Sequence, residues 1–474
     1  MPWEDELRRL DEDREAFRDF DEARPLGNDR LSPRQRVDVL FDAGSFLEIG
    51  ARARGQVAGD GAGSGADGAV PGDGIVAGFG TLAGCAAGVV SEDPLALAST
   101  DGEVGKNKVL RVLAHAYQGK LPIVYLADGP ATPSAAKAPP EGGLLGRYSD
   151  RQLVVPDLHL ESRESPLVMV AFGRLRAEAR LLAATADLVV KRRDAPPSRP
   201  ASADEESADL VVGSDEEAVA VVLRFLSLLP ESPGASLRRS AESAAWGPAG
   251  RLRDDVDPTV LTCRELLAAV FDQHSLLSFD AAGDPSLVVG LARLGGYPAA
   301  FAIGSSDPAG LGESRLRRMS RIARIAARFR LPIVLLQHGA AYSRDAIEAP
   351  RAIERLAELA TLLHDADVPK LCLVSGRGHV LGDFVLGGRE LGIHYVAAWP
   401  QSRVGVDDVA SFTTEVAATE GPDGPWQAAG LGLLDDVILP SETASRLAAM
   451  LRLLAPSRAL PPAHRGSDRR IPFR

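Results

Sequence analysis

The fold of this chain is decided by two stretches in its second half, RLPIVLLQHGAAYSRD (330–345) and VPKLCLVSGRGHVLGDFVLG (368–387). Each holds a short apolar run, Pro332–Leu336 in the first and Leu371–Val374 in the second, followed by glycine and polar residues. Uninterrupted apolar runs that alternate with helical patterns are typical of strands in a parallel α/β sheet. We therefore expect a ligand site in the glycine turns that follow these strands.

The chain repeats itself. The segments RQRVDVLFDAGSFLEI (34–49) and GIVAGFGTLAGCAAGVVSE (74–92) return as LTCRELLAAVFDQHSLLSF (261–279) and LVVGLARLGGYPAAFAIGS (287–305). This self-similarity predicts two similar α/β units in tandem. The predicted divisions are a charged helical segment 1–30, a first domain 31–235, a linker 236–257, a second domain 258–455 and a disordered tail 456–474.

Composition narrows the functional classes. The chain has 53 Lys and Arg against 65 Asp and Glu, a net charge of -12, which argues against nucleic acid as the main partner because phosphate binding needs a basic surface. No apolar run reaches membrane-spanning length, and the charged first residues lack the apolar core of a signal peptide. The three cysteines are far apart, without metal-binding spacing, and we expect buried thiols in a reducing cytoplasm.

Several short motifs in the sequence resemble those of a known family. They are Val368-Pro369-Lys370, Ala398-Trp399-Pro400, the segment RLSPRQRVDVLFDAGSFLEIG (30–50), and Gly72-Asp73-Gly74 followed by IVAGFG. Together these motifs resemble those of the carboxyltransferase (beta) subunit of biotin-dependent acyl-CoA carboxylases of the propionyl-CoA and acetyl-CoA type. The resemblance implies a fold of tandem duplicated crotonase-like α/β domains.

The resemblance also implies a reaction, the transfer of a carboxyl group from carboxybiotin to an acyl-CoA. It implies no covalently bound cofactor and no metal in this chain, because the carboxybiotin is carried by a partner biotin carboxylase and biotin carrier subunit. In the family, pairs of backbone amides stabilise the oxyanions that form, and no side-chain nucleophile is needed. The site lies between subunits, so an oligomer is implied, either of this chain alone or mixed with a related subunit.

In the first half, the resemblance places the substrate at the turn Asp128-Gly129 and the catalytic amides at Gly173 and the pair Ala177-Glu178. The sequence departs from the family here. Asp128-Gly129 is followed by proline, which has no amide hydrogen, where the family has Asp-Ser-Gly-Gly-Ala-Arg, and Ala177-Glu178 replaces a Gly-Gly pair. From Lys191 to Glu206 the sequence is rich in proline, serine and charge, and we expect disorder.

In the second half, the resemblance places substrate contacts at Gln337, Gly339 and Ala340, where the family has Asp, Pro and Gly. It places the second set of catalytic amides at Gly378, Val380, Leu381 and Gly382, within a segment where the family has Tyr-Gly-Gly-Ala-Tyr. Open amide turns at both places favour a working enzyme, whereas turns filled by side chains favour loss of turnover.

Three functions therefore stay open. The first is an acyl-CoA carboxyltransferase, the second a catalytically inactive paralogue that acts in assembly or regulation, and the third a remodelled acyl-CoA decarboxylase or hydrolase. For the third, histidines near the second-half turns offer a general acid or base, or are ordinary turn residues: His338, His379 and His394. The arginines of segment 315–330 either form a solvated helix face or anchor the phosphates of coenzyme A.

Overall fold

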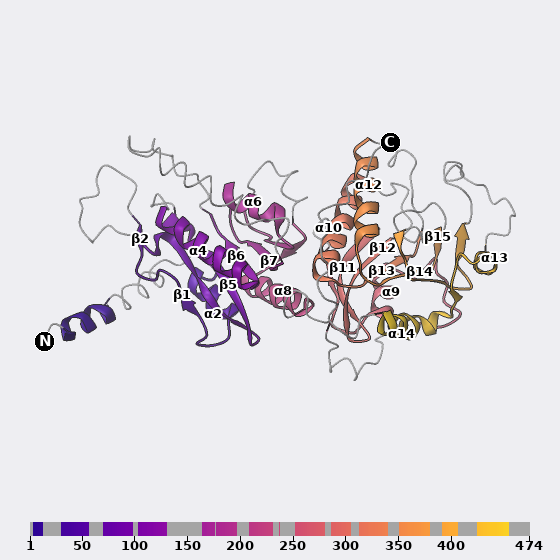
Figure 1. Ribbon diagram of the computed structural model, residues 1–474, viewed down its shortest axis with the longest axis horizontal. Helices are drawn as coiled ribbons and strands as arrows, with labels where there is room; N and C mark the ends of the chain where they lie inside the picture. Colours follow the sequence, from indigo (N-terminus) through magenta and orange to yellow (C-terminus); the bar gives the residue numbers. More distant parts are fainter. Residues whose placement is uncertain are drawn as a thin grey trace. The chain divides into compact units, whose positions relative to one another are not determined.

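The computed structural model contains two compact units, Met1–Ser227 with Phe279–Gly283, and Leu228–Ser278 with Asp284–Arg474. The structure describes residues 3–12, 30–55, 70–97, 103–129, 164–175, 177–196, 208–230, 237, 252–279, 286–304, 312–339, 350–379, 391–405 and 424–454. We call the two parts unit 1 and unit 2 (Figure 1). The first segment that it describes, 3–12, is helical. The predicted tail 456–474 and most of the predicted linker 236–257 lie outside the described residues, so those bounds stay a prediction.

Unit 1 is built on a seven-stranded sheet with the order β1-β4-β5-β6-β7-β8-β9. Its first three strands pair antiparallel and the rest pair parallel. The strands are β1 (Leu47–Glu48), β4 (Ile75–Leu82), β5 (Cys85–Glu92), β6 (Ile123–Ala127), β7 (Leu167–Ala171), β8 (Leu188–Arg192) and β9 (Leu210–Val212), with the small pair β2 (Arg54–Gly55) and β3 (Val70–Pro71) beside them. The helical segments are α2 (Pro33–Leu40), η2 (Gly72–Gly74), α3 (Pro94–Leu97), α4 (Glu103–Gly119), α6 (Ala177–Thr185) and α8 (Asp215–Ser227).

Unit 2 repeats this topology. Its seven-stranded sheet has the order β10-β11-β12-β13-β14-β16-β18, again antiparallel for the first three strands and parallel for the rest. The strands are β10 (Leu277–Ser278), β11 (Leu287–Leu294), β12 (Tyr297–Gly304), β13 (Ile333–Gln337), β14 (Lys370–Val374), β16 (Tyr395–Ala398) and β18 (Asp436–Val437), with the parallel pair β15 (Arg377–His379) and β17 (Arg403–Gly405). The helical segments are α9 (Cys263–Val270), α10 (Glu313–Phe329), α12 (Pro350–Asp365), α13 (Pro425–Gly430), η7 (Pro440–Glu442) and α14 (Thr443–Leu454).

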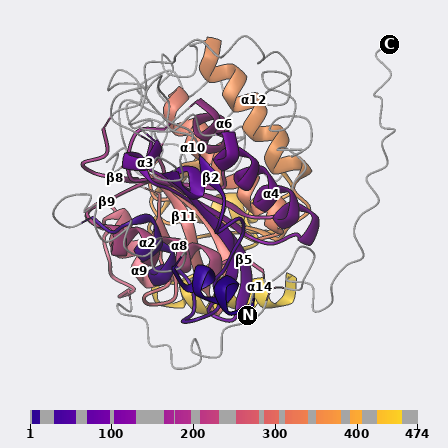
Figure 2. The same ribbon diagram turned by 90° about the vertical axis from the view of Figure 1, so that its left-hand side faces the viewer.

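Helices cover both faces of each sheet. In unit 2, α9 and α14 pack with β-strand side chains into one apolar core around the buried Trp399, and α10 and α12 cover the opposite face over β12 and β13. In unit 1, α4 and α6 pack on one face, and α2 and α8 lie side by side on the other (Figures 1 and 2). Because both faces are covered, the central parallel strands β6 and β7 are uninterrupted apolar runs, IVYLA and LVMVA.

The first helix of each unit begins in the same way. Ser32 caps α2 in a capping box with Gln35, and Thr262 caps α9 in a capping box with Glu265. Such reciprocal bonds satisfy amides that have no partner inside the helix. Proline at the first helical position suits this start of α2, because its missing amide hydrogen would have no partner there.

The repeated motif Asp-x-x-Ser has the same structural role in both units. Asp42 accepts hydrogen bonds from the amides of the β4–β5 turn, and Ser45 accepts one from Thr81 N. In unit 2, Asp272 accepts from Gly295 N and Gly296 N at 2.8 and 2.7 Å, and Ser275 accepts from Arg293 N. The duplication that the sequence predicts therefore extends to individual hydrogen bonds.

Two local predictions are wrong. Lys191 and Arg192 belong to β8 rather than to a disordered segment, because the apolar run that precedes them pairs with β7 and the Arg192 side chain is bound by carboxylates. Cys85 is exposed, because it opens β5 directly after the hairpin turn, whereas Cys263 and Cys372 are buried as expected.

Candidate functional site

The candidate site of unit 1 lies where the parallel strands β6 and β7 end. The turn after β6 contains Asp128 and Gly129, and the turn after β7 contains Phe172 and Gly173. The amide of Phe172 donates to Ala127 O at 2.9 Å, and that of Gly173 makes a longer contact with the same oxygen at 3.4 Å. The two turns are also joined by a hydrogen bond from Gly129 N to Arg174 O. The structure thus brings together the predicted site residues Asp128, Gly129 and Gly173.

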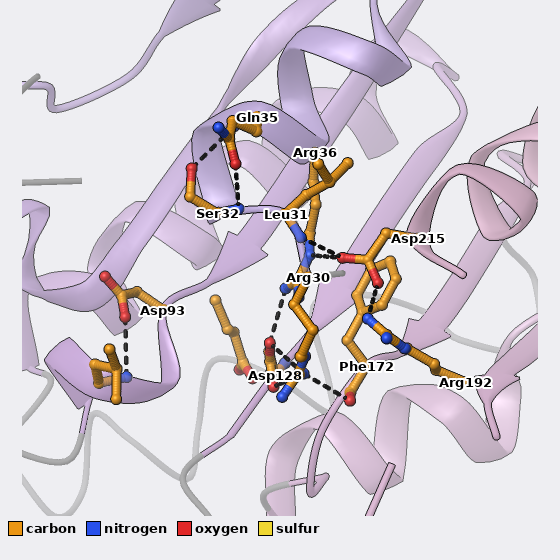
Figure 3. Close-up of polar contacts among 12 residues, drawn as sticks. Arg30, Leu31, Ser32, Gln35, Arg36, Asp93, Asp128, Phe172, Arg192 and Asp215 are labelled. Carbon is orange, nitrogen blue, oxygen red and sulfur yellow. Dashed lines mark hydrogen bonds and ion pairs between the residues drawn. The ribbon is translucent and has the colours of Figure 1, made fainter. Parts of the chain in front are cut away.

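Buried charged side chains surround these turns (Figure 3). Arg36 is fully buried and donates through Nη1 to Asp128 Oδ2 and through Nε to Asp215 Oδ2, both at 2.8 Å. Arg30 donates through Nη2 to both Asp128 oxygens, at 3.0 and 3.1 Å, and Arg192 donates to Asp215 Oδ1 at 2.5 Å. We call these five residues the arginine–aspartate network.

The network stands on elements far apart in the chain. Arg36 lies in α2, Arg192 is the last residue of β8, and Asp215 is the first residue of α8. Asp215 also accepts a hydrogen bond from Leu31 N, just before the start of α2. Since α2 and α8 are neighbours, the network fixes the beginnings of both helices against the end of β6.

Three guanidinium groups face two carboxylates in the network, and the exposed Asp194 adds a third carboxylate at 2.8 Å from Arg192. Burial raises the pKa of the Asp128 carboxyl, and the guanidinium groups of Arg36 and Arg30 oppose this shift. Among the residues that the structure describes, none accepts a hydrogen bond from Arg36 Nη2, but the Arg36 guanidinium carbon lies 4.0 Å from the centre of the Phe172 ring. The ring's electron-rich face therefore stabilises the remaining charge.

Gly173 must be glycine at this place. A Cβ atom there would lie 2.1 Å from Asp128 Oδ1 and 3.2 Å from Gly129 O. The close approach of the two turns therefore depends on the missing side chain. The same approach occurs in unit 2, where a Cβ on Gly376 would lie 2.1 Å from His338 O.

Ala177 and Glu178 are the first two residues of α6 rather than part of an irregular turn. At these positions the backbone amides of an α-helix have no carbonyl partner inside the helix, and they carry the positive end of its dipole. Two amide donors therefore begin α6 four residues after Gly173, although the residues are not glycine.

In unit 2 the residue after β13 is His338, the topological counterpart of Asp128. His338 Nε2 lies 2.5 Å from Leu261 O, just before the cap of α9, so this nitrogen carries the proton. Nδ1 therefore accepts from the buried Ser375 hydroxyl at 3.0 Å, in the turn after β14. Burial lowers the pKa of His338, and the bond to Leu261 opposes this shift.

The other predicted residues of the second half occupy different surroundings. Gln337 ends β13 and is buried, with its side-chain nitrogen 3.7 Å from Cys372 Sγ, while Gly339 donates its amide to Gly304 O at 3.2 Å. Gly378 lies in β15 and pairs with Val404 of β17. The remaining predicted residues lie outside the described residues: Ala340, Val380, Leu381 and Gly382.

The remaining candidates have structural contacts. His394 accepts a hydrogen bond from Lys370 N, and Arg324 of the basic helix α10 pairs with Glu358 of α12. Within the ranges that the structure describes, no group of three or more His, Cys, Asp or Glu residues could hold a metal ion. No helix of the described ranges is long and apolar enough to cross a membrane.

Comparison with known proteins gives these turns a context. The sequence profile of the carboxyl transferase domain matches residues 26–134 and 205–411. The chain belongs to the carboxyl transferase domain family. A relative of this family is the biotin-dependent 3-methylcrotonyl-coenzyme A carboxylase beta1 subunit of Mycobacterium tuberculosis, 27% identical over 432 residues, which cover 84% of this chain and 78% of that protein.

Other carboxyl transferase proteins are similar over nearly the full length. The propionyl-CoA carboxylase beta chain of Saccharopolyspora erythraea is 23% identical over 497 residues, covering 92% of this chain and 89% of that one. Among solved structures, transcarboxylase 12S superposes on this chain with a TM-score of 0.77 at 20% identity, over 98% of both chains. That structure is described as a hexamer assembly with methylmalonyl-coenzyme A bound. The likeness confirms the predicted fold of tandem crotonase-like domains.

The match to the carboxyl transferase domain is interrupted between residues 134 and 205. This interval contains β7, α6 and β8, and therefore Gly173, Ala177 and Glu178. Of the two departures in the first-half turns, the pair Ala177-Glu178 lies in this unmatched interval, whereas the proline after Gly129 lies within the matched residues.

Sequence reasoning missed most of the arginine–aspartate network. It selected Asp128 but not Arg30, Arg36, Arg192 or Asp215. The available signal was the charged residue Arg36 on the otherwise buried face of α2, beside Val37 and Leu40. A fully buried arginine needs a buried partner.

Proposed function

We propose that this chain transfers a carboxyl group from carboxybiotin, held on a partner biotin carboxylase and biotin carrier subunit, to an acyl-CoA. The observation that carries the proposal is the family match, which includes residues of both units. The names of the relatives add support, since they are beta subunits or chains of biotin-dependent carboxylases.

The proposed reaction needs two places that stabilise negative charge. One charge develops on the ureido oxygen of biotin when the N–C bond of carboxybiotin breaks and carbon dioxide leaves. The biotin anion takes the proton that the α-carbon of the acyl-CoA loses, so the other charge develops on the thioester oxygen as the enolate forms, and the enolate carbon then bonds to the carbon dioxide. Backbone amides that point at such oxygens act without reorganisation during the reaction. In unit 1 the amides of Ala177 and Glu178, which as the first residues of α6 have no carbonyl partner inside the helix, fit this task.

In unit 2 the corresponding donors are proposed from the sequence, at Gly378 and at the segment Val380, Leu381 and Gly382. Substrate contacts are proposed at Gly129 in unit 1 and at Gln337, Gly339 and Ala340 in unit 2. The metal-free chemistry of enolate formation and carboxyl transfer requires no further cofactor on this chain.

A second function is favoured by one specific observation. The pair Ala177-Glu178 replaces two glycines and lies in the interval that the family profile does not match. A glutamate carboxylate beside a developing oxyanion would oppose it by about 1 to 4 kcal/mol, depending on screening. A paralogue that keeps the fold for assembly or regulation, without turnover, is therefore the alternative. A decarboxylase or hydrolase is a further outcome of the test.

We also propose that the chain acts in the cytoplasm as an oligomer. The support for an oligomer is the similar transcarboxylase 12S, which is described as a hexamer assembly. The oligomer would be of this chain alone or mixed with a related carboxyltransferase subunit.

The test is carboxylation of acyl-CoA by the purified chain mixed with a biotin carboxylase and a biotin carrier, with acetyl-, propionyl- and longer acyl-CoA as substrates. Carboxylated product above a control without the chain supports the proposal. Absence of product, together with stable assembly of the chain with an active carboxyltransferase subunit, supports the paralogue. Absence of both product and assembly turns the question to decarboxylase and hydrolase assays.

A further inference from the structure

We infer that Arg36 is a positioning residue, which holds the Phe172-Gly173 turn in place through Asp128 and the Phe172 ring. The role in catalysis rests on the proposed function, because that turn leads to the amides at the start of α6. The role in positioning rests only on the contacts of unit 1.

The first argument is the geometry of the guanidinium group. Two edges of Arg36 are used for hydrogen bonds, Nη1 toward Asp128 and Nε toward Asp215, and its face lies 4.0 Å from the centre of the Phe172 ring. Arginine alone offers a planar group with this many directed donors and a face that stacks on an aromatic ring. A lysine ammonium at this place could not bind both carboxylates and cover the ring.

The second argument is the way the turn packs against Asp128. A Cβ on Gly173 would lie only 2.1 Å from Asp128 Oδ1, and Arg30, which binds Asp128, also donates to Phe172 O at 2.9 Å. These contacts add to the backbone hydrogen bonds from Phe172 N to Ala127 O and from Gly129 N to Arg174 O, at 2.9 and 3.0 Å. The turn thus packs against the Asp128 carboxylate, and Arg36 and Arg30 hold this carboxylate in place.

The third argument comes from unit 2, where different residues make the same connection. His338 links Leu261, before the cap of α9, to Ser375 in the turn after β14. The Gly376 backbone rests against His338 O as Gly173 rests against Asp128. Two unrelated side chains therefore tie the same three segments, the start of the first helix and the two strand-end turns.

The geometry consequently gives Asp128 a role in positioning rather than in direct contact with substrate. Its carboxylate is 1% exposed, and both oxygens accept hydrogen bonds from arginine.

The test is amide hydrogen exchange of the full chain in the variant Arg36→Met, with Arg34→Met as the matched control. Arg34 lies in the same helix but pairs with Glu48 outside the network. We expect exchange at residues 172–174 and at the start of α6 to become about ten- to a hundredfold faster in Arg36→Met, as for the loss of a charge-assisted hydrogen bond, with the β4–β5 hairpin unchanged. Arg36→Lys should recover only part of the protection.

Two results would overturn the inference. One is exchange in the turn that rises no more in Arg36→Met than in Arg34→Met. The other is equal acceleration throughout unit 1, which would mean general loss of stability. If Arg36→Met does not fold, Arg36→Lys provides the comparison, and exchange at 172–174 that rises no more in Arg36→Lys than in Arg34→Met contradicts the inference.

Activity gives a separate measure. If the chain carboxylates acyl-CoA, we expect Arg36→Met to lower kcat by about tenfold or more while KM for acyl-CoA changes by less than about threefold, because amide donors act on the transition state. An equal loss through KM alone would contradict the role in catalysis. An inactive wild-type chain would contradict the proposed function, and the exchange measurement would still decide the inference on positioning.

Discussion

The substitution Gly173→Ala tests the packing of the two turns of unit 1 most directly. The added Cβ would lie 2.1 Å from Asp128 Oδ1. Carbon and oxygen atoms that are not bonded approach to only about 3.2 Å, so the turn or the carboxylate must move by roughly 1 Å. Asp128 cannot move this far without weakening its bonds to Arg30 and Arg36, at 3.0 and 2.8 Å.

The expected cost follows from these contacts. Overpacking in a buried site costs about 1 to 3 kcal/mol, and a weakened charge-assisted hydrogen bond about 1.5 to 3 kcal/mol if it is lost entirely. We expect Gly173→Ala to lower the free energy of unfolding of unit 1 by about 2 to 4 kcal/mol. For a unit of about 200 residues, this lowers the melting temperature by roughly 4 to 16 °C.

Differential scanning calorimetry of the full chain measures this effect, with Gly213→Ala as control. Gly213 belongs to the same unit, and a Cβ there would make an ordinary contact of 3.4 Å with Glu217. The reasoning is refuted if Gly173→Ala unfolds within about 1 °C of Gly213→Ala, because the turn would then have room that the structure denies.

The remaining predictions concern stability in each unit. Burial lowers the pKa of His338, so the unfolded chain binds a proton that the folded chain does not, and unit 2 loses stability as the pH falls below about 6.5. Between pH 7 and 5, the melting temperature of His338→Gln should therefore fall less than that of the wild type, and an equal fall would contradict the assignment. Asp272→Ala should lower the free energy of unfolding, measured with urea, by about 2 to 3 kcal/mol, and Asp42→Ala by only about 1 kcal/mol. The reason is that Asp272 is buried and binds the amides of Gly295 and Gly296, whereas the Asp42 contacts are exposed to water. Equal costs would refute the role of burial. Trp399→Phe should cost about 1 to 3 kcal/mol, because it removes the hydrogen bond from Trp399 Nε1 to Thr443 Oγ1 at 2.9 Å and leaves the buried hydroxyl without its donor, and a Thr443→Val background should abolish most of this cost.

Much of the fold could be predicted because its signals are local. The apolar runs Pro332–Leu336 and Leu371–Val374 become β13 and β14. The repeated segments also indicated the duplication, and their shared Asp-x-x-Ser motif makes the same hydrogen bonds in both units.

The site was only partly predictable because its connections are long-range. Asp128 and Gly173 could be placed by resemblance, but the bond from Arg36 to Asp215 joins residues 179 positions apart. No local period links such a pair. The structure begins α6 at Ala177-Glu178, and whether the amides of this helix start serve as the predicted donors stays a prediction.

The central claim is that the chain catalyses carboxyl transfer, and the half-reaction with free biotin tests it without a partner subunit. The purified chain is mixed with biotin and a carboxylated acyl-CoA whose transferable carboxyl group carries an isotopic label, with an active carboxyltransferase subunit as positive control. We predict label in biotin that depends on the chain and falls about tenfold or more in Arg36→Met. No transfer above background for any acyl chain, from folded protein under conditions in which the control transfers label, would contradict the claim.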